Sequence, residues 1–217
     1  MAKMREKYVV DMVKLSQLKN DTKTGLEYGD VFEVDGMMDF SRTASENSTK
    51  VFYDGRLGSV VYDATTEELE LSLYGIAPDV AAKMWNDEYN ETTGQYIKVP
   101  NAPRPYFALQ ARNGYTNDPA HRYFTYYKIS LAELTDEQIK GMSDSYSHNP
   151  LKVKATVLET EYKEERTTAL GDKVNAALCF HSIDDDVVDG INWETKYFEK
   201  VNKPSEITAI CEEALNA

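Results

Sequence analysis

The chain has 217 residues, a length that fits one large domain or two small ones. Its formal net charge of −13 argues against tight nucleic-acid binding, which needs clustered lysine and arginine. Hydrophobic residues make up 41% of the chain, enough for a sizeable core, and the acidic balance suits a surface that nucleic acid must pass without sticking.

The first fifty residues predict two strands and two polar loops. Residues 6–18 mix apolar and polar positions, as in a strand, and residues 20–29 are rich in turn formers. Residues 31–34 predict a second, short strand that ends at the turn pair Asp35-Gly36. Residues 37–49 lose their periodicity after the first few positions, so we expect a long polar surface loop that a partner would order.

The clearest strand of the chain lies at residues 68–74. Leucine alternates there with polar residues, which predicts one apolar and one acidic face. The apolar face holds Leu69, Leu71 and Leu73, and the polar face holds Glu68, Glu70, Ser72 and Tyr74. Two β-rich runs, residues 51–53 and 59–62, precede this strand, and Pro78 begins a helix that we expect to run to about Asn90.

Further strands are predicted in the second half of the chain. Residues 96–105 hold three prolines and cannot form a central strand. Residues 106–113 and 122–130 alternate on either side of a polar turn, which indicates an antiparallel hairpin. Residues 133–144 break the alternation and predict a loop or a short helical turn. Residues 151–160 and 173–182 then predict two more strands.

The chain ends in an acidic loop and two helices. The acidic loop spans residues 183–190, and residues 193–200 and 205–216 carry helical patterns, with Ser205 as a candidate N-cap. The whole pattern amounts to about eight strands, one central helix and a helical C-terminus. The polar stretch at residues 161–168 is the best candidate boundary, and we expect a single main domain.

Candidate chemical groups are few and poorly arranged. Cys179 and His181 are two residues apart and would face the same side of a strand, but no third orienting group accompanies them. The acidic loop lacks the spacing of a calcium-binding loop, so we favour a solvated turn over a metal site. The chain has no phosphate-binding, nucleophile-elbow or zinc-protease motif. We therefore expect no enzyme, no cofactor and no metal.

Cysteine usage and hydropathy bear on the compartment. The two cysteines form neither a CxxC motif nor a disulfide framework, which indicates a reducing compartment. The first ten residues lack the apolar core of a signal peptide, and no run reaches the ~20 apolar residues of a membrane helix. We expect a soluble protein that is made without export.

Five segments carry a family resemblance, in chain order. They are TGLEYG at 24–29, SENSTKVFYDG at 45–55, ELELSLYGIAPDVAAKMW at 68–85, PYFALQARNG at 105–114 and WETKYFEKVNKP at 193–204. Together they resemble the major tail proteins, or tail tube proteins, of long-tailed and non-contractile bacteriophages that infect mainly Gram-positive bacteria. Met37-Met38 and residues 205–217 depart from the family pattern.

The resemblance implies a fold and an assembly. Residues 1–204 would form a mainly β domain, a β-sandwich or barrel with a flanking helix, and residues 205–217 a helical extension. Subunits of this family form hexameric rings, which stack into a virion tail tube that conducts DNA during ejection. The implied partners are further copies of the chain, other tail proteins at the tube ends, the tape measure protein inside and DNA in transient passage, with no membrane.

The resemblance also implies roles for individual residues. Glu68 and Glu70 are candidate lumen-facing carboxylates, because a bore crossed by a polyanion should repel it; an ordinary outer surface is the alternative. The candidate contacts between subunits or rings are loop residues Ser41, Glu46, Asn47, Lys50, Tyr96, Pro103 and Arg104.

Two other functions fit the same sequence. The first is a stand-alone β-sandwich that binds carbohydrate or protein, which predicts a monomer with a concave aromatic patch. The second is a hydrolase with a dispersed site around Cys179 and His181. Rings or tubes under the electron microscope would distinguish the tail tube from both.

Overall fold

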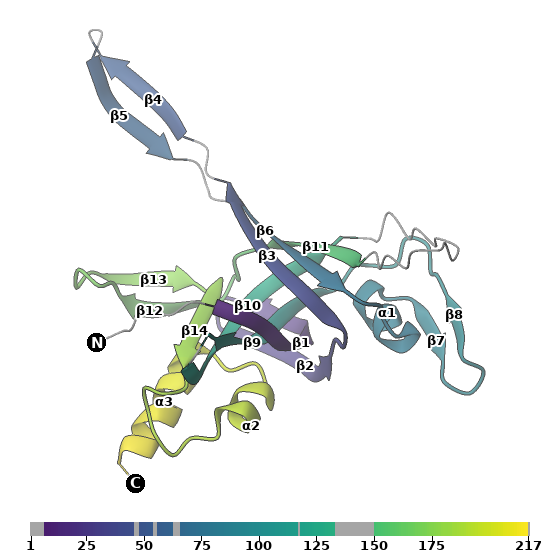
Figure 1. The fold of residues 1–217 in the computed structure, drawn as a ribbon. Coiled ribbons are helices and arrows are strands. Elements are labelled where there is room, and N and C mark those ends of the chain that lie inside the picture. Colours follow the sequence, from purple (N-terminus) through teal and green to yellow (C-terminus); the bar gives the residue numbers. More distant parts are fainter. Residues whose placement is uncertain are drawn as a thin grey trace.

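Antiparallel strands make up most of the protein, with a few short helices added (Figure 1). The computed structural model describes residues 7–45, 48–53, 56–62, 66–116, 118–132 and 150–216. The predicted mainly β fold with a helical C-terminus is therefore confirmed at the level of fold class.

Eight strands of the described residues form one antiparallel sheet. They are β1 (Lys7–Thr22), β2 (Gly25–Glu33), β3 (Met37–Ser45), β6 (Thr66–Leu73), β9 (Tyr106–Tyr115), β10 (Asp118–Leu131), β11 (Leu151–Val157) and β14 (Phe180–Asp184). The sheet runs in the order β2–β1–β9–β10–β11–β6–β3, and β14 pairs with β10 as a side branch. The predicted hairpin of residues 106–113 and 122–130 is the β9–β10 pair at the centre of this sheet.

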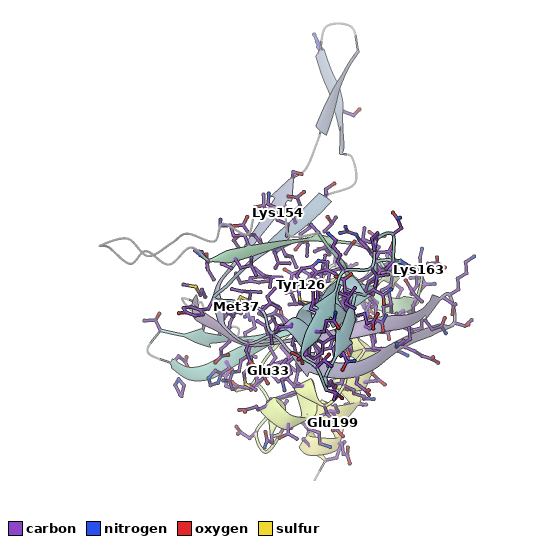
Figure 2. The ribbon with its side chains drawn as sticks, turned by 90° about the vertical axis from the view of Figure 1, so that its right-hand side faces the viewer. Glu33, Met37, Tyr126, Lys154, Lys163 and Glu199 are labelled. Carbon is purple, nitrogen blue, oxygen red and sulfur yellow. The ribbon has the colours of Figure 1, made fainter. Side chains whose placement is uncertain are left out.

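The sheet folds back on itself around its largest apolar core. In the strand order β11 and β6 separate β3 from β10, yet the ring of Phe40 on β3 lies 5.6 Å from that of Phe124 and 6.3 Å from that of Tyr126 on β10. Such contacts require that the β11–β6–β3 half lie over the β1–β9–β10 half, with Tyr126 in the interior of the body (Figure 2). The leucine face of β6, predicted as the core face, is confirmed: Leu69, Leu71 and Leu73 are buried there.

The C-terminal helices cover the outer face of the central strands. Helices α2 (Trp193–Phe198) and α3 (Pro204–Leu215) follow β14. A second cluster joins them to β10, and its buried members are Tyr123, Trp193, Tyr197, Phe198 and Ile207. Since Ile207 belongs to this cluster, α3 packs on the body that the preceding residues form. Ser205 is not its cap as predicted: Lys203 holds the N-cap position, and the Ser205 hydroxyl donates to Glu164 at 2.9 Å.

Three small hairpins and one helix lie outside the main sheet. The hairpins are β4 (Ser48–Tyr53) with β5 (Arg56–Tyr62), β7 (Glu88–Asn90) with β8 (Gln95–Ile97), and β12 (Lys163–Thr167) with β13 (Lys173–Ala177). Helix α1 (Pro78–Trp85) begins with the predicted proline and buries Met84 in the main core. It ends at Asn86 in a left-handed conformation, so the predicted extension to about Asn90 is wrong and β7 lies there instead.

The largest error of the sequence prediction concerns residues 37–49. They were expected to form a polar surface loop, but Met37–Ser45 is strand β3, and Ser48 and Thr49 begin strand β4. Strand β3 is at the end of the sheet and pairs only with β6 in the described chain, so most of its residues are exposed and it needs few apolar side chains. A polar edge strand therefore carries little of the alternation that predicts a strand.

Two other segments contain more strand than predicted. The expected loop at residues 20–29 reduces to a short turn, because β1 continues to Thr22 and β2 begins at Gly25. The single strand expected at residues 173–182 is two strands, β13 and β14, which belong to different sheets. The irregular stretch predicted at residues 133–144 lies outside the described residues.

Candidate assembly surfaces

The polar face of β6 carries the two candidate lumen carboxylates. Glu68 is exposed, and Glu70 is half-buried and binds the Lys152 ammonium of β11 at 2.5 Å. The β6–β11 register places Lys154 opposite Glu70. This face therefore mixes acidic with basic side chains, because the lysines of the neighbouring strand share it. The sequence analysis missed these lysines, although residues 151–157 alternate clearly.

Ser41 is the candidate contact residue that the structure brings beside these carboxylates. The β3–β6 register pairs Ser41 with Glu70, and paired residues of antiparallel strands lie on the same face. Ser41 and Lys50 occupy strands rather than the predicted loop. Glu46 and Asn47, two further candidates, lie outside the described residues.

A buried carboxylate stands on the opposite face of β6. Glu67 lies beside the leucine face and forms an ion pair with Arg42 of β3, whose Nη2 donates to Oε2 at 3.1 Å. The hydrogen bond to Glu67 raises the pKa of Arg42, and burial, with the Glu67 charge, raises the pKa of Tyr126. This cluster escaped the sequence analysis because Arg42 was assigned to a loop.

An aromatic groove opens next to this ion pair. It encloses about 520 Å³ between β3 on one side and β10 and β14 on the other. Its aromatic residues are Phe40, Phe124, Tyr126 and Phe180, and Met38, Arg42, Asn113, Arg122 and Ser182 are among its other lining residues. The rings contact one another, with Tyr126 and Phe180 at 4.9 Å between centroids. We call this the β3–β14 groove.

The β4–β5 hairpin projects away from the rest of the protein (Figures 1 and 2). It pairs with no other described strand. Seven of its thirteen strand residues are apolar or aromatic by type: Val51, Phe52, Tyr53, Leu57, Val60, Val61 and Tyr62. Such a composition is typical of strands that pack against something.

The proline-rich segment is tied against the end of α1. Asp87 accepts hydrogen bonds from the Tyr96 hydroxyl and from the Val99 backbone N–H, and the carbonyl of Pro103 accepts one from Asn86 at 3.1 Å. Tyr96 and Arg104 line a cavity of about 650 Å³ beside α1. These three candidates therefore lie in a segment that hydrogen bonds hold beside the end of α1.

Cys179 and His181 lie in different electrostatic surroundings. Burial, with the nearby Glu67, raises the pKa of the Cys179 thiol. Burial, together with Arg166, lowers the pKa of His181 to about 4. Strand β14 begins at Phe180, so Cys179 precedes the strand and His181 lies within it. Both groups are neutral at pH 7, so this pair lacks the thiolate that nucleophilic catalysis uses.

The acidic loop is used for ion pairs within the protein. Asp184 accepts hydrogen bonds from the Arg122 guanidinium at 2.7 and 2.9 Å, and Asp185 lies 3.2 Å from the His121 ring. The predicted solvated loop is thus partly the end of β14, packed beside β10. In the described residues no cluster of three or more acidic, histidine or cysteine side chains could hold a metal ion. His148 lies outside them.

Comparison with known proteins adds no relative. No family model and no curated protein matches the chain. In the described residues, none of the helices is both long and apolar enough to cross a lipid bilayer. Function must therefore be inferred from the surfaces described above.

Proposed function

We propose that this protein is a structural subunit of a phage tail tube, which assembles into stacked hexameric rings around a conduit for DNA. The observation that carries the proposal is the β4–β5 hairpin, which is rich in apolar residues and has no partner strand in the described chain. An isolated two-stranded hairpin is only marginally stable in water. In the proposed assembly, contacts with other copies of the chain stabilise this hairpin.

The folded antiparallel sheet supports the same proposal. Such a sheet agrees with the β-sandwich or barrel that tail tube subunits are expected to have, and its strand order ends at β2 and β3. Open sheet edges are a liability in a monomer but supply pairing surfaces in an assembly. Ser41 lies on one of these edge strands.

Charge on the polar face of β6 refines the lumen assignment. Lys152 offsets the charge of Glu70, whereas Glu68 has Thr156 and Thr43 as its register partners. In this proposal Glu68 supplies more of the repulsion toward DNA than Glu70 does. The net charge of −13 acts in the same direction over the whole subunit.

Electron microscopy of the purified full-length chain tests the proposal. We expect rings or tubes of uniform diameter in negative stain, and large species in light scattering that grow with protein concentration. A strict monomer at high concentration contradicts the proposal.

The alternative is a stand-alone binding module, and the β3–β14 groove is the observation that favours it. A concave, partly aromatic cavity of about 520 Å³ has the size of a small-ligand site. This alternative predicts a monomer that is retained on a carbohydrate or peptide column, whereas the tail tube predicts assembly without any added ligand.

A further inference from the structure

We infer that the β3–β14 groove receives the β4–β5 hairpin of a second copy of the chain. The inference rests on the proposed function, since it needs subunits that assemble, and it adds the receiving surface. The groove is open to solvent, and the hairpin pairs with no other described strand. The hairpin also projects away from its own body (Figure 1).

The groove is bordered by two strands that each have one paired side. In the described chain β3 pairs only with β6, and β14 pairs only with β10. An incoming strand can add to such an edge through main-chain hydrogen bonds, while its alternate side chains enter the groove. The space between β3 and β14 thus has the form of a position where one strand is missing.

The lining of the groove is chemically suited to an apolar strand. Met38 is 53% exposed and Phe180 is 45% exposed, and both are large apolar side chains at the mouth of the groove. Asn113 is only 4% exposed, and its Oδ1 has no hydrogen-bond donor among the described residues.

Charge opposes contact with the hairpin strands less than contact with the rest of a second copy. Residues 48–62 contain Lys50 and Arg56 against one carboxylate, Asp54, which gives this segment a net charge of +1. Since the whole chain has a net charge of −13, the residues outside this segment have a net charge of −14. Two acidic bodies repel each other, whereas the strands of the hairpin carry no net negative charge and meet less repulsion from an acidic body.

The geometry of the contact makes it open-ended. The hairpin and the groove are different surfaces, so each copy can offer its hairpin to one neighbour and its groove to another. A contact of this kind produces rings or stacks rather than a closed dimer. It therefore fits an assembly that grows by repeated addition of subunits.

Charge substitutions in the groove test the inference. Met38→Lys and Phe180→Lys should each raise the protein concentration needed for assembly at least tenfold, because each replaces an apolar side chain of the groove with a charge that the docked hairpin would bury. Leu170→Lys is the matched control: Leu170 is 92% exposed, lies outside the groove, and gives the same change of charge. Thermal unfolding of each variant verifies that the subunit still folds.

Disulfide trapping tests the contact directly. In a background in which Cys179 and Cys211 are replaced by serine, a Ser182→Cys chain is mixed with a Val51→Cys chain and oxidised. We expect a heterodimer on a non-reducing gel, and none when Leu170→Cys replaces Ser182→Cys.

The outcomes separate this inference from the proposed function. If the wild-type chain forms tubes, the groove variants assemble as well as Leu170→Lys, and no heterodimer is trapped, the inference is wrong and the tail tube proposal stands. If the wild-type chain stays monomeric at high concentration, both are wrong.

Discussion

Arg42 and Glu67 form a partly buried ion pair beside the main core. Glu67 is buried beside the leucine face of β6, and Arg42 reaches it from β3 while its guanidinium lies 6.0 Å from the Phe180 ring. The Arg42 side chain is 52% exposed, whereas the Glu67 side chain is only 11% exposed. Removing one partner is therefore unequal in its effects, because only the carboxylate would be left buried without a counter-charge.

Arg42→Ala should lower the free energy of unfolding by about 1–3 kcal/mol, less than for a fully buried pair because Arg42 is partly solvated. The double variant Arg42→Ala with Glu67→Gln should recover much of this loss, since no buried charge remains. Urea denaturation at pH 7 measures both. Lys152→Ala, which removes the exposed partner of Glu70, is the control and should barely move the midpoint. Equal losses in the single and double variants would show that buried charge is not the cause.

His181 makes the stability of the subunit depend on pH. Its Nδ1 is buried with no hydrogen-bond partner among the described residues, and burial with Arg166 lowers its pKa from 6.5 to about 4. A lowered histidine pKa means that the folded state favours the neutral ring. The corresponding stability is fully present above pH 6.5 and is lost as the pH falls from 6.5 toward 4.

The wild-type chain should lose up to about 3 kcal/mol of unfolding free energy through His181 between pH 7 and pH 4. His181→Gln cannot titrate, so its loss over the same interval should be smaller by that amount. The remaining loss, from carboxylates, is common to both proteins and cancels in the comparison. Denaturant titrations at several pH values measure the difference, and parallel curves for the two proteins would overturn the assignment.

The β4–β5 hairpin is the element on which the functional proposals depend. It is inserted between β3 and β6, whose register pairs Ser45 with Thr66 next to the insertion. The two ends of the insertion are thus already held side by side by the β3–β6 ladder. The body does not need the hairpin in order to bring these strands together.

Replacing residues 46–65 by Asn-Gly should leave the body folded, because a two-residue turn of this type closes an antiparallel pair. The unfolding free energy should change by less than about 1 kcal/mol, since the hairpin has no strand partner in the described body. Assembly should be lost. Circular dichroism with urea denaturation follows the fold, and negative-stain microscopy follows assembly. If this variant still forms tubes, the hairpin is not needed for assembly and the inference is wrong.

The sequence predicted elements best where strands are well buried. In β6 buried leucines alternate with more exposed residues, and β9 and β10 are buried at most positions, so their apolar residues are numerous enough to indicate strands. Strand β3 was missed because an exposed edge tolerates polar residues at almost every position. For the same reason the sequence could not predict Arg42 beside Glu67 or Lys152 beside Glu70. Those contacts depend on which strands are neighbours in the sheet, and the local periodicity of a sequence does not determine strand order.

At the scale of the whole molecule, the net charge of −13 sets a condition on any assembly. Copies of so acidic a subunit repel one another, so their contacts must bury apolar surface or pair opposite charges. Two parts of the described chain that meet this condition are the aromatic lining of the β3–β14 groove and the apolar composition of the β4–β5 hairpin.

The placement of the hairpin also has a mechanical consequence. The hairpin extends from the β3–β6 pair roughly along the direction of these strands (Figure 1). Strand β3 pairs only with β6 in the described chain, so among the hydrogen bonds of the sheet those of the β6–β11 ladder, from Leu73↔Leu151 to Glu67↔Val157, join the β3–β6 pair to the next strand of the body. The hydrogen bonds of this ladder run across the direction of a pull on the hairpin, so they are sheared together rather than opened one after another. A tail built from such subunits would resist stretching along its hairpins more strongly than peeling at its edges.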